Sequence, residues 1–151
     1  MNTSLLAYRP PRIAMTLVLI AATTHFLTPL RTAHLYSSKT LGATVGVIGF
    51  TVMVWAWAQF KQRGVAICPT EETARLLTDG VYRLTRNPMY LGMTLMLAGL
   101  AAWMGSLPFY AAAAGFFGII HPAFCPYEEE KLTTRLGSQY QAYTSRVRRW
   151  V

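Results

Sequence analysis

The stretch NPMYLGMTLMLAGLAAWMGSLPFYAAAAGFFGIIHPAF, residues 87–124, decides the fold. It holds two apolar runs, at 89–103 and 107–124, and between them a short Gly-Ser-Leu-Pro sequence at 105–108. A cluster of Gly, Ser and Pro between two periodic segments is typical of a tight turn. The stretch therefore predicts a helical hairpin made of two apolar helices.

Two further apolar stretches lie upstream, at 13–30 and 41–60. Each approaches the roughly 20 apolar residues that cross a hydrocarbon layer of about 30 Å. Only 13% of the residues are charged and 53% are apolar, whereas soluble domains carry about a quarter charged residues. Backbone polar groups inside lipid must be satisfied within their own segment, which favours helices. We expect an all-α integral membrane bundle of about four spans, the first of which is not a cleavable signal peptide.

The charge of the chain is distributed unevenly around these stretches. The 151 residues carry a net charge of +8, and 12 of the 14 Lys and Arg residues fall on one side of a four-span arrangement. By the positive-inside rule, both termini, the loop between the second and third spans, and the tail are cytoplasmic. Basic residues interleaved with apolar runs indicate a membrane protein and not one that binds nucleic acid.

The two cysteines, Cys68 and Cys125, are too few for a disulfide framework. Neither lies at a metal-ligand spacing from a histidine or from the other cysteine, so no metal site is expected.

The end of the second loop predicts a helix that begins at the membrane surface. Asp79 and Gly80 form a turn signal, and Asn87 followed by Pro88 is typical of a cap and the first position of a helix. A helix N-terminus presents free N–H groups and partial positive charge, which suit a carboxylate or another anion. The alternative is that Asn87 only ends the loop and that Arg86 only reaches anionic lipid headgroups.

The tail shows a helical pattern, because apolar and aromatic residues recur at steps of three and four: Leu132, Leu136, Tyr140, Tyr143 and Val147. This periodicity predicts one C-terminal amphipathic helix on the cytoplasmic surface or folded against the second loop.

Three adjacent acidic residues lie at the start of this helix, and helix geometry places them on different sides. At about 100° per residue, Glu128 and Glu129 border the buried stripe while Glu130 faces water. Arg135 also borders the stripe and is expected to meet the same group as Glu129. The alternative is that the acids only favour the first turn of a helix, and that His121, seven residues before Glu128, only packs.

Three segments together resemble a known family. They are GVYR at 80–83, RNPMYLG at 86–92, and the Glu128-Glu129 pair with the helical pattern that follows it. Their order, their separation by the hairpin and their predicted common side resemble the isoprenylcysteine carboxyl methyltransferase and phospholipid methyltransferase superfamily. The resemblance covers about the C-terminal half of the chain.

The resemblance implies one membrane methyltransferase domain over 1–151 that binds S-adenosylmethionine between 61–92 and 121–150. The residues that it implies for the cofactor are Gly80, Val81, Tyr82, Arg86, Asn87, Pro88, Tyr90, Leu91, His121, Glu128 and Glu129. Glu129 and Arg135 are expected to be catalytic. Arg135 would hold a carboxylate acceptor in line with the methyl group, and Glu129 would fix the position of that arginine or of the cofactor.

The resemblance implies a lipid-like acceptor, first of all the carboxylate of an isoprenylcysteine-like compound. A phospholipid amine is the alternative acceptor, and Glu129 would then act as a base, because an amine must lose a proton. Two other functions stay open. A sterol reductase that binds NADPH has a similar C-terminal arrangement, and a non-enzymatic membrane adaptor would use only the basic face.

Overall fold

The described residues of the computed structural model, 10–27, 35–63 and 76–151, are helical apart from short connections. This confirms the all-α class. The elements in chain order are α2 (Pro10–Leu27), α3 (Lys39–Gln62), the 3₁₀ turn η2 (Gly80–Arg83), α4 (Pro88–Met104), α5 (Leu107–Ile119), the π-helical turn η3 (Ile120–Phe124), α6 (Cys125–Leu136) and α7 (Ser138–Thr144).

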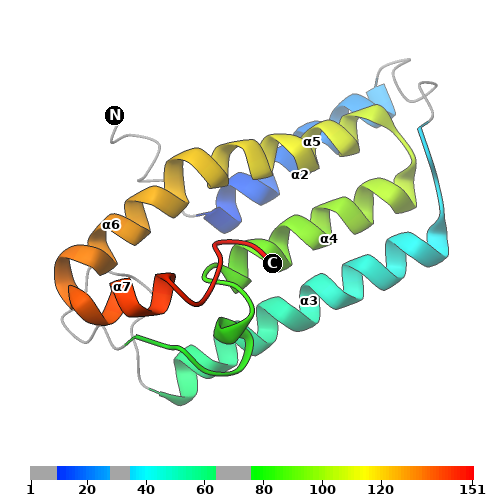
Figure 1. The fold of residues 1–151 in the computed structure, drawn as a ribbon. Helices are drawn as coiled ribbons and strands as arrows, with labels where there is room; N and C mark the ends of the chain where they lie inside the picture. The colour runs from blue at the N-terminus through cyan, green and yellow to red at the C-terminus, as the bar shows by residue number, and fades with distance from the viewer. Residues whose placement is uncertain (1–9, 28–34, 64–75) are drawn as a thin grey trace.

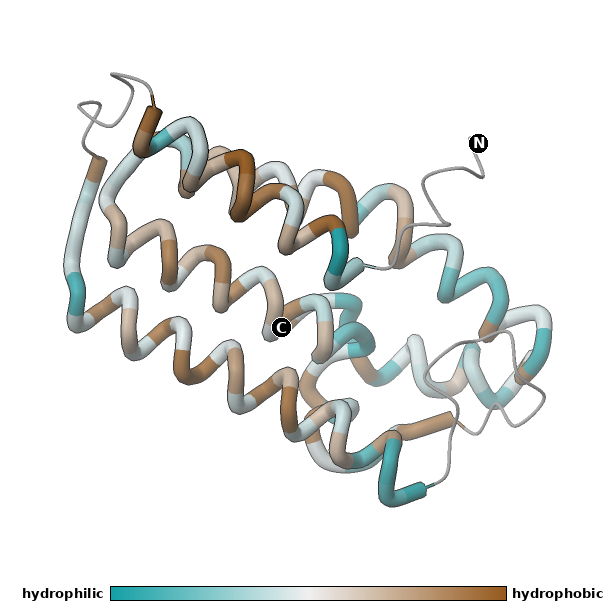
Figure 2. Tube along the Cα trace, turned by 180° about the vertical axis from the view of Figure 1, so that it is seen from behind, coloured by the Kyte–Doolittle hydropathy of each residue, from teal (hydrophilic) through white to brown (hydrophobic). Residues whose placement is uncertain are grey.

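The long helices lie side by side in the order α3, α4, α5 and α2. α3 packs along α4, α4 packs on α5, and α5 packs on α2 (Figure 1). α6 continues α5 beyond one end of this bundle, and α7 and the C-terminus turn back toward the start of α4. Hydrophilic residues are concentrated at that end, whereas the helices of the bundle are mostly hydrophobic (Figure 2).

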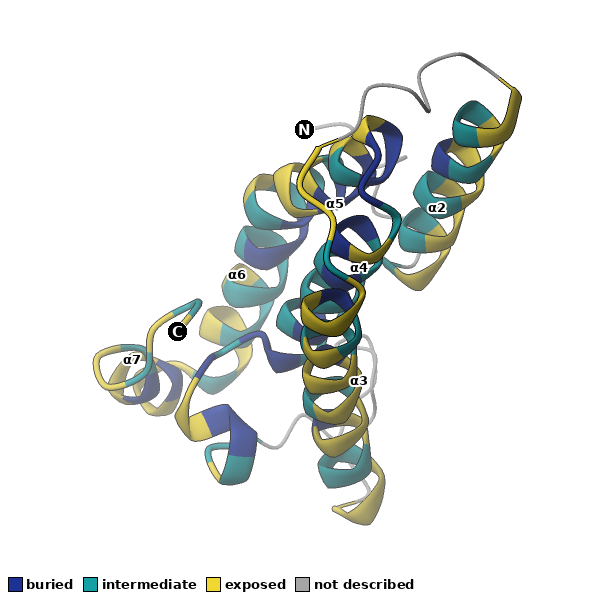
Figure 3. Cartoon of the chain, turned by 90° about the vertical axis from the view of Figure 1, so that its right-hand side faces the viewer, coloured by how far each residue is buried: buried dark blue, intermediate teal, exposed yellow. Residues whose placement is uncertain are grey.

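Within the described residues, three helices are long and apolar enough to cross a membrane: α2, α3, and the continuous helix Leu107–Leu136. α4 is a shorter apolar helix of 17 residues. Much of α2 and α3 is exposed (Figure 3). The exposed residues of these helices include large apolar ones, which suits contact with lipid. Among them are Met15, Leu19, Ile20, Phe26, Val47, Ile48, Phe50, Val54, Trp55 and Trp57. These helices indicate an integral multi-pass membrane protein. The predicted end of the first span at Leu30, and Cys68 in the second loop, lie outside the described residues.

The predicted hairpin turn between the last two apolar runs is confirmed. α4 ends at Gly105, whose left-handed φ of +63° and N–H bond to the Ala101 carbonyl close the helix. α5 then begins at Leu107, with Pro108 in its first turn, where a missing N–H does no harm.

The tail departs from the expectation of one separate amphipathic helix. The chain continues from α5 to α6 without a break, because the wider π turn at 120–124 accommodates Pro122, which has no N–H to donate. The helix ends instead at Gly137, whose φ of +50° lies outside the helical region, and α7 begins there in a new direction. Tyr140 and Tyr143 are nevertheless buried, as their spacing predicted.

The contact between α3 and α4 depends on glycines spaced seven residues apart on each helix. A Cβ on Gly49 would lie 2.6 Å from the Gly92 carbonyl oxygen, and one on Gly99 would lie 2.5 Å from the Gly46 nitrogen. A Cβ on Gly42 would lie 2.7 Å from the Gly99 oxygen. A side chain at any of these three glycines would therefore collide with the backbone of the other helix, so the contact requires the small-residue packing common between membrane helices. α3 thereby approaches α4 closely along its length.

We expect Gly49→Ala to destabilise the protein by about 1–3 kcal/mol, because the added methyl group meets backbone atoms that can move only if the helices separate. The thermal unfolding midpoint in detergent measures this. Gly118→Ala is the matched control, since nothing lies within 4 Å of a Cβ there. Equal midpoints for both variants would contradict the close packing of α3 on α4.

Candidate functional site

Two cross-links join the start of α4 to the start of α6. The Tyr90 hydroxyl donates to Glu128 Oε1 at 2.5 Å, and Arg86 Nη1 lies 3.3 Å from Glu129 Oε1. Glu128 and Glu129 are half-buried, and Glu130 is exposed, which confirms the predicted difference between the three acids. The second loop and the tail, both predicted to carry the site, therefore meet here.

Glu129 has a second cationic partner that the sequence analysis did not identify. Arg149 Nε donates to Glu129 Oε1 at 2.9 Å, and its Nη2 donates to Oε2 at 2.7 Å. The side chains of Glu129 and Arg86 are 17% exposed and that of Arg149 is 28% exposed. Limited exposure and the two-pronged geometry make this pair stronger than an ordinary surface ion pair. Arg86, Glu129 and Arg149 form what we call the charge cluster.

Residues 147–150, next to the C-terminal Val151, run beside the end of the second loop, and we call them the C-terminal strap. The Arg86 N–H donates to the Arg148 carbonyl at 3.0 Å, and the wholly buried Thr85 hydroxyl donates to the Arg149 carbonyl at 2.8 Å. These backbone contacts fix the strap to the loop independently of the charged side chains.

The strap also contacts the helix on its other side. Trp150 Nε1 donates to His121 Nδ1 at 2.9 Å, and the Trp150 ring lies 5.1 Å from the Phe117 ring. His121 itself stacks on Phe117, with ring centroids 5.5 Å apart. The hydrogen bond requires a neutral imidazole that carries its proton on Nε2. His121 is therefore connected to the site through Trp150.

The start of α4 leaves donors without partners. Asn87 occupies the predicted cap position, but its side chain makes no capping hydrogen bond, and its N–H donates to the Thr85 hydroxyl instead. Pro88 is buried at the first helical position, and the half-buried Leu91 donates its N–H to the Asn87 carbonyl. Among the described residues, Asn87 Nδ2 and Arg86 Nε are buried and have no hydrogen-bond acceptor. Such donors at the positive end of a helix suit an anion.

The turn η2 packs against α3 and holds α7. Val81 and Tyr82 are buried in a small apolar cluster with Phe60, whose ring lies 5.6 Å from that of Tyr82. The Tyr143 hydroxyl donates to the Tyr82 carbonyl at 2.6 Å. Burial raises the pKa of both phenols above its ordinary value, so both hydroxyls stay protonated. Gly80, with a φ of +57°, closes the turn against α3.

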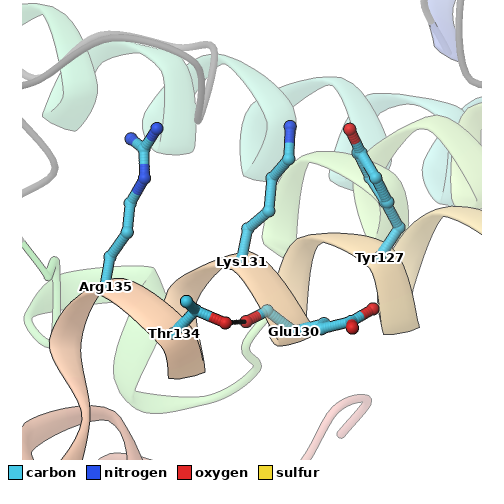
Figure 4. A pocket seen from close by; sticks show the side chains of 5 residues that line it. All are labelled: Tyr127, Glu130, Lys131, Thr134 and Arg135. Atoms are coloured by element: carbon cyan, nitrogen blue, oxygen red, sulfur yellow. Dashed lines mark hydrogen bonds between the residues drawn. The ribbon is translucent and has the colours of Figure 1, made fainter.

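Arg135 lies on a different side of α6 from Glu129. It is exposed and borders a surface depression of about 300 Å³ that is lined by side chains of α6 (Figure 4). Tyr127, Lys131 and Arg135 extend from α6 in one row, and Lys131 Nζ lies 4.3 Å from the centre of the Tyr127 ring. Glu130 and Thr134 also line the depression. The described contacts of the Glu129 carboxylate are instead with Arg86 and Arg149.

Arg149, Trp150 and Thr85 are the residues of this region that the sequence analysis did not single out. The basic and aromatic end of the chain, RVRRW at 146–150, was the available signal. It carries no recognisable spacing, because its contacts are made with residues 20 to 64 positions away.

We expect Tyr143→Phe to destabilise the protein by about 1–3 kcal/mol, because it leaves the buried Tyr82 carbonyl without its donor. Thermal unfolding in detergent measures the loss. Tyr110→Phe is the control: its hydroxyl bonds to the Tyr36 carbonyl at an exposed site, where water replaces it. The control is expected to change stability by less than about 0.5 kcal/mol. A larger loss in the control would contradict the importance of the buried bond.

Comparison with known proteins gives a family match over more than half of the chain. Residues 37–139 match the model of the phospholipid methyltransferase family. An uncharacterized protein of Haemophilus influenzae is 30% identical over 63 residues, which are 42% of this chain and 100% of that protein. No solved structure matches the chain. The family match includes both cross-links between α4 and α6, and the strap lies beyond it.

Proposed function

The chain belongs to the phospholipid methyltransferase family, and from this premise we propose that it transfers a methyl group from S-adenosylmethionine to a lipid-like acceptor. Residues 1–151 would form one domain, with the cofactor site between 61–92 and 121–150. The observation that supports the proposal most directly is the meeting of these two segments at the charge cluster. We also propose that this end of the bundle is cytoplasmic, as the distribution of Lys and Arg predicts.

The residues of the site suit the charges of this cofactor. S-adenosylmethionine carries a carboxylate, an ammonium group and a sulfonium cation. The unpartnered donors Asn87 Nδ2 and Arg86 Nε, at the N-terminus of α4, suit the carboxylate. The Glu128 carboxylate, which accepts from the Tyr90 hydroxyl, suits a positive group of the cofactor, whereas Glu129 neutralises part of the charge of Arg149 and Arg86. The charge cluster contains two cations and one anion, and an additional anion would offset this surplus.

The chain's own residues would position and desolvate the reactants. When bound, the cofactor supplies a methyl group activated by the sulfonium. Transfer is an in-line displacement, so alignment of the acceptor with the methyl group and removal of water are what the protein must provide. The limited exposure of the charge cluster and the hydrogen bond from Tyr90 to Glu128 give fixed geometry in a largely dry site.

Two acceptors are supported by different observations. The cationic row of half-buried Lys131 and exposed Arg135, which lines the depression on α6, supports an isoprenylcysteine-like carboxylate, because such groups attract anions. The family match supports a phospholipid amine, for which Glu129 would accept the proton. An oxygen acceptor yields a methyl ester, and an amine acceptor yields an N-methyl product.

Calorimetry with S-adenosylhomocysteine on the detergent-purified chain tests the cofactor site. We expect Glu129→Gln and Tyr90→Phe each to weaken binding by about tenfold or more, because each removes a charge or hydrogen bond that orders the site. Glu130→Gln is the matched control: it neutralises an exposed neighbouring acid and should bind within about twofold of the wild type.

Absence of binding by the wild-type chain would overturn the cofactor proposal and would favour the membrane adaptor. Binding of NADPH in place of S-adenosylhomocysteine would favour the reductase. Equal weakening by Glu129→Gln and Glu130→Gln would contradict the assignment of the site to one face of α6.

Incubation with methyl-labelled S-adenosylmethionine and two separate acceptors, a farnesylated cysteine derivative and phosphatidylethanolamine, distinguishes the chemistry. A product that loses its label in mild base is a methyl ester, and a stable product is an N-methyl amine. We expect Arg135→Gln to raise KM for the carboxylate acceptor by about fivefold or more and to leave cofactor binding unchanged. Labelling of phosphatidylethanolamine alone would overturn the carboxylate assignment and support the amine.

A further inference from the structure

We infer that Arg149 is a positioning residue of the methyl-transfer site, and that the C-terminal strap forms one of its walls. The inference rests on the proposed function. The family match ends at residue 139, and the resemblance implies only the broad segment 121–150, without a role for Arg149.

The strap is anchored on two sides, so the Arg149 side chain starts from a fixed point. The Thr85 hydroxyl and the Arg86 N–H hold its backbone to the loop before α4. Trp150 holds it to His121 on the helix that leads into α6. Because the backbone is held on both sides, the Arg149 guanidinium loses little freedom when it meets Glu129.

Arg149 also determines which hydrogen-bond donors of Arg86 stay available to a ligand. Its fork occupies both oxygens of Glu129, at 2.9 and 2.7 Å. Arg86 is left with one longer contact to the same carboxylate, at 3.3 Å, and with an Nε that has no acceptor among the described residues. Without Arg149, Glu129 would be able to take Arg86 as its two-pronged partner. That rearrangement would consume the donor that suits the carboxylate of the cofactor.

Arg149 therefore acts through Glu129 and Arg86, and its removal should affect cofactor affinity more than the chemical step. We expect Arg149→Gln to raise Kd for S-adenosylhomocysteine by about tenfold, because the substitution removes the charge-assisted hydrogen bonds to Glu129. In the methyl-transfer assay, KM for S-adenosylmethionine should rise by a similar factor while kcat stays within about threefold. Arg149→Lys keeps the charge without the fork and should restore part of the affinity.

The experiment uses the full chain in detergent and measures calorimetric binding and the thermal unfolding midpoint for each variant. Arg146→Gln is the matched control, because Arg146 is exposed just before the strap and its Nε bonds to the Ala142 carbonyl of the adjacent helix. It should bind like the wild type. Trp150→Phe keeps an aromatic ring but removes the N–H that His121 accepts, and it should weaken binding less than Arg149→Gln.

A double variant tests whether Arg149 acts through Glu129. In a Glu129→Gln background, Arg149→Gln should weaken binding by less than about twofold more, because its partner charge is already gone. Independent, multiplying effects would overturn the positioning role. If Arg149→Gln lowers the unfolding midpoint, Arg149→Lys and Trp150→Phe provide the comparison in folded protein.

The outcomes separate the two proposals. A wild-type chain that fails to bind S-adenosylhomocysteine overturns the proposed function. A wild-type chain that binds while Arg149→Gln and Arg149→Lys bind equally well overturns the role of the strap alone. A fall in kcat with unchanged KM would likewise overturn it, since that result would place Arg149 at the reacting atoms.

Discussion

The Glu129 carboxylate is the interaction on which the rest of the site depends. It accepts both prongs of Arg149 and lies 3.3 Å from Arg86, so it joins α6 to the C-terminal strap and to the loop before α4. The strap is held in addition by hydrogen bonds from Thr85 and the Arg86 N–H, and by the bond from Trp150 to His121. A partly buried carboxylate between two guanidinium groups is costly unless both stay in place, so the three segments are ordered together.

The bilayer explains why this cluster lies at one end of the molecule. Within lipid the helices satisfy their own backbone groups, and α3 meets α4 through glycines such as Gly49 and Gly92. Such packing leaves no room for a polar site between these two helices. Polar chemistry is therefore confined to the end where α6, α7 and the strap return to the start of α4. The methyl donor and lipid-like acceptor that we propose would be able to meet at such a boundary.

The tail illustrates how far periodicity predicts a structure. The spacing of Tyr140 and Tyr143 predicted their burial correctly, and the angles of Glu128, Glu129 and Glu130 predicted which of them faces water. The same pattern predicted one helix where there are two. Periodicity reports which residues face the core, but a single glycine such as Gly137 changes the direction of the chain without disturbing that pattern.

Local sequence determined the helical class, the hairpin at Gly105 and the start of α4 at Pro88, because each depends on hydrophobic length or on backbone preferences of a few adjacent residues. Only the tertiary structure decided that Arg149 meets Glu129 and that Trp150 meets His121. These contacts join residues that lie far apart in the chain. Local backbone preferences do not encode such contacts, since they form only when the helices pack against one another.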